Sequence, residues 1–181
     1  MENQQLTTLE TITLGGGCFW CLDAVFRRVQ GVGRVECGYS NGQIHNPEYE
    51  QVCAGETGHA EVVQVEFDPQ QVSLEQLLAV FFSIHDPTSL KQQGADCGTQ
   101  YRSAIYWSEP EQLPRILAVM TQAKEGFQRP VVTELAQLAN YWPAEPYHQD
   151  YFAKHPGQGY CAAIIGPKVQ KFQATFKSLL G

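Results

Sequence analysis

The sequence lacks both a long hydrophobic run and a cluster of basic residues. No uninterrupted apolar stretch is longer than that of residues 77–82, whereas a helix that spans a bilayer needs about 20 apolar residues. Twelve Lys and Arg stand against 19 Asp and Glu, which gives a net charge of −7. We therefore expect no membrane partner and no nucleic-acid partner. Residues 1–10 have neither a basic start nor an apolar core, so we expect a flexible tail and no signal peptide there.

Charged residues and cysteines are also scarce. Charged residues make up 17% of the chain, so polar contacts must come largely from uncharged side chains. Six cysteines in 181 residues are too few for a disulfide scaffold. We expect reduced thiols in a cytoplasmic protein, where cysteines are more often catalytic or metal-binding than structural. With 43% apolar residues and no repeat or linker, residues 1–181 are predicted to form a single domain.

Apolar periodicity predicts alternating strands and helices. Alternation with period two predicts strands at residues 11–14, 35–39, 60–68 and 103–107. The order of elements, β-α-β-β-α-β, is that of a ferredoxin-like plait. We therefore expect an α+β fold of this type with an added helix at residues 111–124, an added strand at residues 131–135 and long coil-rich loops.

Two helices complete the predicted plait. Apolar residues with helical spacing from Leu22 to Val29 predict a helix that ends at Gly31. Ser73 and Gln76 form a capping box at the start of the second helix. Three stretches without a clear pattern, residues 40–59, 86–102 and 136–166, hold many of the aromatic, His and Gly residues. Because long loops in compact domains are usually functional, we expect them near the active site.

A glycine-rich turn before the first helix contains the most informative cysteine. The sequence GGGCFWC (residues 15–21) places Cys18 at or just before the start of that helix. Unpaired N–H groups and the helix dipole favour a thiolate at this place and lower the pKa of a cysteine. We expect a nucleophile. A phosphate-binding turn is the weaker alternative, because no dinucleotide or P-loop pattern follows, and a packed Cys18 is the third interpretation.

Cys18 and Cys21 also form a C-x-x-C pair. Such a pair suits a dithiol redox centre or half of a zinc site. No second C-x-x-C exists in the sequence, so the redox interpretation is favoured and no metal is expected. A zinc-stabilised binding module and a general dithiol-disulfide oxidoreductase remain as alternatives. The aromatic residues Phe19 and Trp20 follow Cys18 and would form an apolar wall for a methyl-bearing substrate.

Glu61 is a candidate general acid. In the strand of residues 60–68 it shares the face of Val63 and Val65, whereas Glu66 lies on the opposite face. A carboxyl group on the buried face has a raised pKa unless it is paired, and it can then stay protonated near neutral pH. The alternative interpretation is a solvated Glu61 at the exposed end of the strand.

Further candidates lie in the unassigned stretches. They are Tyr49, Asp96, Tyr101 and His148, each of which is unremarkable alone. Cys161 follows Gly and Tyr on a segment that we expect to be flexible and exposed.

Five motifs together resemble the A-type methionine sulfoxide reductases, which are peptide-methionine (S)-S-oxide reductases. The motifs are GGCFW (residues 16–20), YEQVC (49–53), TGHAE (57–61), GTQYRS (98–103) and YHQDY (147–151). The resemblance covers residues 12–176 and implies thiol-dependent reduction of methionine S-sulfoxide, in proteins, in peptides and as the free amino acid, as repair of oxidative damage. It implies no cofactor, thioredoxin as reductant, and oxidised proteins and peptides as partners. We expect a monomer.

The resemblance also implies roles for individual residues. Cys18 would attack the sulfoxide sulfur, and Phe19 and Trp20 would hold the methyl group. Glu61, Tyr49 and Tyr101 would protonate or hydrogen-bond the sulfoxide oxygen, with Asp96 and His148 in support. The sulfenic acid formed on Cys18 would then condense with a second thiol. We expect Cys161 to resolve it, because Cys161 matches the Gly-Tyr-Cys segment of many relatives, with Cys21 as the alternative.

Overall fold

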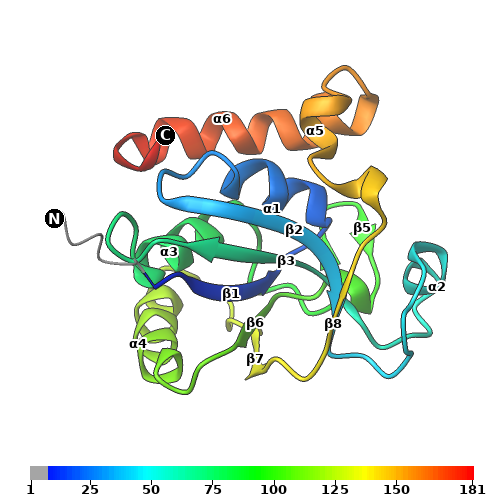
Figure 1. The fold of residues 1–181 in the computed structure, drawn as a ribbon, viewed down its shortest axis with the longest axis horizontal. Helices are drawn as coiled ribbons and strands as arrows, with labels where there is room; N and C mark the ends of the chain where they lie inside the picture. Colours follow the sequence, from blue (N-terminus) through cyan, green and yellow to red (C-terminus); the bar gives the residue numbers. More distant parts are fainter. Residues whose placement is uncertain (1–7) are drawn as a thin grey trace, which may run out of the picture.

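The computed structural model describes residues 8–181, and it has a mixed α+β architecture. A sheet of six strands runs through the centre of the molecule (Figure 1). A tail was expected at residues 1–10. Residues 1–7 of it lie outside the described residues, and Glu10 already belongs to the first strand. None of the helices described is long and apolar enough to cross a membrane.

Four antiparallel strands form the middle of the sheet. In sheet order they are β6 (Ala104–Trp107), β1 (Glu10–Gly15), β3 (Ala60–Phe67) and β2 (Val32–Ser40). β7 (Glu134–Gln137) pairs with β6 in parallel, and β8 (Tyr141–Pro143) pairs with β2 antiparallel. The four strands expected from alternation are thus present. The added strand was expected at residues 131–135, but pairing with β6 begins only at Glu134.

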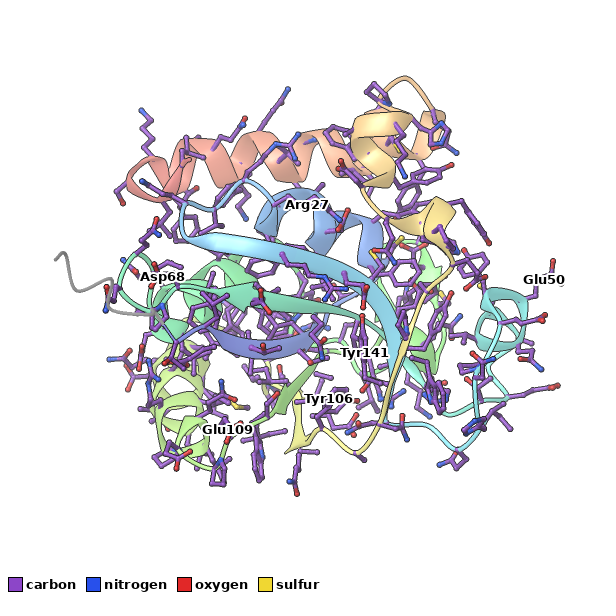
Figure 2. The ribbon with its side chains drawn as sticks, in the orientation of Figure 1. Arg27, Glu50, Asp68, Tyr106, Glu109 and Tyr141 are labelled. Carbon is purple, nitrogen blue, oxygen red and sulfur yellow. The ribbon has the colours of Figure 1, made fainter. Side chains whose placement is uncertain are left out.

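The helices cover mainly one face of this sheet. They are α1 (Phe19–Phe26), α3 (Leu74–Ile84), α4 (Gln112–Glu125) and α6 (Gly166–Thr175). The main core lies beneath them and includes Leu14, Val63, Val65 and Phe81, all fully buried. The opposite face has a smaller cluster, and Figure 2 shows Tyr106 and Tyr141 on that side. Alternation along β1 and β3 therefore decides which side chains meet the helices.

The first and second helices differ in how well the sequence predicted them. The capping box of α3 is present, because Ser73 and Gln76 exchange side-chain to backbone hydrogen bonds. α1 was expected to continue to Val29 but ends at Phe26. Val29 instead forms a β-bridge with Leu180, so a contact with the C-terminus replaces the last helical turn. α6, which lies along α1 in Figure 1, was not predicted.

The three unassigned stretches contain short elements instead of pure coil. Residues 40–59 include α2 (Tyr49–Cys53), and residues 86–102 include β4 (Gln92–Gln93), β5 (Asp96–Cys97) and the 3-10 helix η1 (Thr99–Tyr101). Residues 136–166 include the end of β7, then β8, the 3-10 helix η2 (Pro146–His148), α5 (Tyr151–Lys154) and the π-helix η3 (Cys161–Ile165). A last 3-10 helix, η4 (Lys177–Leu179), follows α6. These elements are too short for a periodic signal.

Candidate active site

Cys18 lies at the N-terminus of α1, as its place after the glycines predicted. It is the residue that precedes the helix, with an extended backbone. Gly17 before it has a φ of +85°, and a Cβ there would come within 2.9 Å of the Gln93 Cβ. The turn therefore needs glycine both for its left-handed backbone and for its close approach to β4.

Glu61 points from β3 toward the same helix end. Its side chain is buried, with 1% of the residue exposed, which excludes the interpretation as a solvated strand end. The backbone N–H of Phe19 donates to Glu61 Oε1 at 3.2 Å, and Oε2 has no hydrogen-bond partner among the described residues. Burial raises the pKa of Glu61 to about 8. The carboxyl group is therefore mostly protonated at neutral pH, and its free oxygen can donate a proton.

The thiol of Cys18 does not have the low pKa that its position predicted. The Trp20 amide hydrogen-bonds the sulfur and lowers the pKa, but burial and the nearby Glu61 raise it well above its usual value. The first free N–H of the helix, that of Phe19, is already bound to Glu61. Desolvation therefore outweighs the helix N-terminus here, and Cys18 is a neutral thiol in the resting protein.

The aromatic residues after Cys18 are packed more closely than expected. Phe19 is fully buried, and its ring centroid lies 5.0 Å from that of His148 and 5.7 Å from that of Tyr39. Trp20 stacks on Tyr151 at 3.8 Å with nearly parallel rings. In the resting structure each ring of the expected apolar wall beside Cys18 thus already has an aromatic neighbour.

His148 closes this cluster. It is fully buried, and its Nδ1 accepts a hydrogen bond from Trp20 Nε1 at 3.1 Å. Burial lowers the pKa of His148, so the ring is neutral and carries its proton on Nε2. That Nε2 has no hydrogen-bond partner among the described residues and lies 4.0 Å from Glu145 Oε2.

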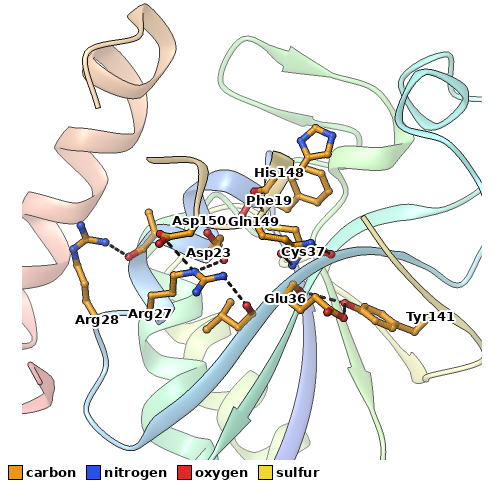
Figure 3. Close-up of polar contacts among 12 residues, drawn as sticks. Phe19, Asp23, Arg27, Arg28, Glu36, Cys37, Tyr141, His148, Gln149 and Asp150 are labelled. Carbon is orange, nitrogen blue, oxygen red and sulfur yellow. Dashed lines mark hydrogen bonds and ion pairs between the residues drawn. The ribbon is translucent and has the colours of Figure 1, made fainter. Parts of the chain in front are cut away.

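A single glutamine holds the segment of His148 against the sheet. Gln149 Oε1 accepts from the Cys37 N–H at 2.8 Å, and its Nε2 donates to the Cys37 carbonyl at 3.0 Å (Figure 3). These are the hydrogen bonds that a neighbouring strand would make. Next to them, Arg27 bonds Asp23 and the Val35 carbonyl, each at 2.8 Å. The side chain of Gln149 thus extends the pairing of β8 to the segment that carries His148.

Both candidate tyrosines lie near Glu61, and Tyr49 also contacts the aromatic cluster. The ring of Tyr49, on α2, is 4.4 Å from the His148 ring, and the Tyr49 N–H donates to Glu145 Oε2 at 3.2 Å. Tyr101, on η1, lies where the charge of Glu61 acts on it. Burial raises the pKa of both phenols, and the neighbouring acidic groups raise it further. Both hydroxyls are therefore proton donors at any physiological pH.

Asp96 lies in a cavity beside Cys18. It accepts a hydrogen bond from the Tyr160 hydroxyl at 2.7 Å. Cys18, Asp96 and Tyr160 line a cavity of about 820 Å³, whereas Phe19, Trp20 and Glu61 do not. Tyr160 was missed by the sequence reasoning. Its only signal was its place before Cys161 in the Gly-Tyr-Cys segment.

The two candidate resolving thiols have different surroundings. Cys161 was expected on a flexible, exposed segment, but it is fully buried in the π-helix η3. That expectation is wrong because Gly159 and Tyr160 lead into a helix, not into a loop. Cys21 is also buried, 2% exposed, one turn after Cys18, and its Sγ lies 3.9 Å from the Tyr160 hydroxyl. All six cysteines are free.

The described residues contain no group of three or more His, Cys, Asp or Glu side chains that could hold a metal ion. Comparison with known proteins agrees with the motifs. The profile of the family described as "Peptide methionine sulfoxide reductase" matches residues 10–180. The chain belongs to this family.

Relatives and solved structures extend this match over nearly the whole chain. The chain is 52% identical to the peptide methionine sulfoxide reductase MsrA of Polynucleobacter asymbioticus, over 99% of this chain and 96% of the relative. It resembles the methionine sulfoxide reductase A structure of Corynebacterium diphtheriae with a TM-score of 0.81 and 35% identity, over 90% of this chain and 82% of the other.

A yeast structure is also similar. Reduced Mxr1 of Saccharomyces cerevisiae matches with a TM-score of 0.79 and 32% identity, over 87% of this chain and 91% of the other. Mxr1 in complex with Trx2 matches with a TM-score of 0.56 and 22% identity, over 83% of this chain and 90% of the other. A match at this identity shows the fold alone. This methionine sulfoxide reductase is therefore an oxidoreductase.

Proposed function

We propose that this reductase uses Cys18 as its nucleophile and Glu61 as its general acid. Family membership gives the reaction, which is thiol-dependent reduction of methionine sulfoxide. The observation that supports the two roles is a neutral, buried carboxyl group bonded to the N–H of Phe19, the residue directly after the thiol. A sulfoxide oxygen is a poor leaving group until it is protonated, so the reaction needs an acid beside the sulfur nucleophile.

The raised pKa values are consistent with a reaction that needs no net proton. The Cys18 sulfur attacks the sulfoxide sulfur while Glu61 donates its proton to the oxygen. The oxygen, as hydroxyl, passes to Cys18, the methionine thioether leaves, and the thiol proton of Cys18 returns to Glu61. Cys18 ends as a sulfenic acid, and methionine is reduced by two electrons. Neutral Glu61 also removes the repulsion that an ionised Glu61 would exert on the developing thiolate.

The remaining site residues act around these two. Tyr49 and Tyr101 donate hydrogen bonds to the sulfoxide oxygen, which their neutral hydroxyls support. Phe19 and Trp20 hold the methyl group, with His148 orienting the indole through its 3.1 Å hydrogen bond. Because Tyr151 covers Trp20, substrate binding must displace or share that stacked ring. Asp96 supports the site through its hydrogen bond from Tyr160.

Cys21 is the thiol that the resting geometry favours for resolving the sulfenic acid. Cys18 directly precedes the helix and Cys21 lies in its first turn, where residues three apart have Cβ atoms about 5–6 Å apart. A small backbone shift at this helix start brings such a pair within disulfide range. Cys161 is packed in η3 and must leave its helix before it can reach Cys18. Condensation of the sulfenic acid with the Cys21 thiol forms the disulfide and releases water. Cys161 then acts later, by thiol exchange with that disulfide.

The wider assignment follows from the family and the composition. Thioredoxin is the proposed reductant of the disulfide, which the complex of Mxr1 with Trx2 supports by analogy. Oxidised proteins and peptides, and free methionine S-sulfoxide, are the proposed substrates. Six free cysteines support a cytoplasmic protein, for which we propose a monomer of one domain. The strand order β6-β1-β3-β2 supports a ferredoxin-like plait as the core.

Turnover of a blocked methionine sulfoxide with dithiothreitol tests the function. We expect reduction of the S epimer only, and none by Cys18→Ser. Reduction of both epimers, or activity of Cys18→Ser, would contradict the assignment. Mapping the disulfide after one turnover tests the resolving thiol. We expect a Cys18–Cys21 bond when the reaction is stopped before exchange with Cys161, and a Cys18–Cys161 bond in Cys21→Ser. If Cys18–Cys161 is the first bond to form in the unaltered protein, the order is reversed.

A further inference from the structure

The cavity beside Cys18 extends away from the residues assigned to the sulfoxide group. Apart from Cys18, its walls come from the end of α3, the β4–β5 hairpin, Phe127 just beyond α4, and η3 with α6. Its volume of about 820 Å³ is within the usual range of ligand sites, about 300–1,000 Å³. That is more room than one methionine side chain needs. The cavity therefore continues the active site, with Cys18 as the shared residue.

The walls of this cleft are mainly apolar. Phe82, Ile84, Phe127, Ala163 and Ile164 line it, and Ile164 is 40% exposed. Exposed aliphatic and aromatic groups at the entrance of a cleft are a common feature of binding surfaces. They would contact apolar side chains of a bound polypeptide.

The charges in the cleft differ from those of the whole protein. The chain has a net charge of −7, yet Lys168 and Lys171 both line the cleft. Lys171 Nζ donates to the Ser83 carbonyl at 3.2 Å. Within residues 8–181, Lys168 takes part in none of the ion pairs or side-chain hydrogen bonds found, while it is close enough to Cys21 to lower the pKa of that thiol.

The two carboxylates of the cleft are already engaged. Asp86 pairs with Arg129 at 3.1 Å and accepts hydrogen bonds from Thr88. Asp96 accepts from Tyr160. The cleft therefore offers an uncommitted cation above an apolar wall, next to the nucleophile.

We propose that this cleft binds the stretch of substrate polypeptide next to the oxidised methionine, and that Lys168 favours a substrate with an acidic side chain there. The inference rests on the proposed function, because it needs the sulfoxide to react at Cys18. Continuity with Cys18 identifies the occupant as substrate, since a chain that presents its sulfoxide to this thiol must leave the site through a neighbouring groove. The lysine and the apolar wall together suit an acidic residue beside apolar ones.

The test compares blocked pentapeptides with methionine S-sulfoxide in the centre and glutamate, glutamine or lysine on both sides. The readout is kcat/KM with dithiothreitol, divided by kcat/KM for blocked methionine S-sulfoxide, which has no flanking residues. We expect the glutamate peptide to be preferred over the lysine peptide at low salt and the preference to shrink as salt rises. In Lys168→Glu the ratio for the glutamate peptide falls roughly threefold to tenfold, as for a partly exposed ion pair and its reversal.

Lys177→Glu is the matched control. Lys177 is exposed and does not line the cleft, and its substitution changes the net charge by the same amount as Lys168→Glu. The kcat/KM ratios of Lys177→Glu should therefore equal those of the unaltered protein. Equal ratios for all three peptides, or equal effects of both variants, would overturn the cleft assignment while leaving the reductase intact. A complete lack of turnover of blocked methionine S-sulfoxide would instead contradict the proposed function. A Lys168→Glu effect on thioredoxin-driven but not dithiothreitol-driven turnover would make the cleft a reductant site and overturn the proposal.

Discussion

At the scale of the residue, Glu61 shows the clearest conflict between stability and chemistry. Its burial raises the pKa to about 8, from a usual value near 4.5. Between these two values the unfolded chain releases the proton that the folded chain keeps. The free energy of unfolding therefore falls as the pH rises through this window. The protein keeps a destabilising acid at a place where the reaction needs its proton.

Glu61→Gln should separate the two effects. The amide keeps the shape and cannot donate a catalytic proton, so we expect the reductive step to slow roughly 10²- to 10⁴-fold with nearly unchanged substrate affinity. Single-turnover kinetics with blocked methionine S-sulfoxide measure this. In the unaltered protein the rate of the reductive step should also fall as the pH rises through about 8, because Glu61 loses its proton there. The variant should lack this pH dependence. An unchanged rate in the variant would remove the acid assignment.

The same variant should be more stable at neutral pH. We expect a gain of about 1–3 kcal/mol in the free energy of unfolding at pH 7, which vanishes near pH 4, because glutamine does not have to take up a proton on folding. Urea denaturation at several pH values measures it. A variant that is less stable at pH 7 would show that Glu61 is ionised in the folded state.

At the scale of the element, local signals determine where a helix starts. Ser73 Oγ accepts from the Gln76 N–H at 3.1 Å, and Gln76 Oε1 accepts from the Ser73 N–H at 2.9 Å. These bonds satisfy two N–H groups that a helix start leaves free. Ser73→Ala should therefore cost about 1 kcal/mol of stability, measured by urea denaturation. Ser73→Asp, which can still cap, should cost less; an equal loss in both variants would argue against the capping role.

Gln149 acts at the same scale, as a side chain that replaces part of a strand. Its two hydrogen bonds to Cys37 are worth about 1 kcal/mol each, so Gln149→Ala should lose roughly 1–2 kcal/mol. Hydrogen exchange should accelerate at the Cys37 amide, which loses its acceptor. Gln149→Met keeps the bulk without the hydrogen bonds and should behave similarly. If the exchange rate at Cys37 does not change, the amide is protected by packing alone.

At the scale of the whole molecule, packing decides which thiols are accessible. Cys53 and Cys97 are exposed, whereas Cys37 and Cys161 are fully buried. Iodoacetamide should therefore label Cys97 and Cys53 of the reduced native protein first, and label Cys37 and Cys161 only as the chain opens. Mass spectrometry of the peptides gives the order. Labelling of Cys161 as fast as that of Cys97 would mean that η3 opens readily, and it would restore Cys161 as the first resolving thiol.

The sequence by itself determined the four central strands, the start of α3, Cys18 at a helix N-terminus and Glu61 on the buried face. Each follows from local chemistry: period-two alternation, a capping pair, a run of glycines before a helix. The family motifs added the reaction. None of these signals depends on residues far apart in the chain.

Only the tertiary structure decided the pKa of Cys18, the burial of Cys161, the covering of Trp20 by Tyr151 and the cleft with Lys168. Each depends on segments that are distant in sequence and adjacent in space. Desolvation is a property of everything that surrounds a group, so no spacing along the chain could reveal that burial would outweigh the helix N-terminus at Cys18. For the same reason the spacing along the chain did not reveal η3 and α6, which pack against α1.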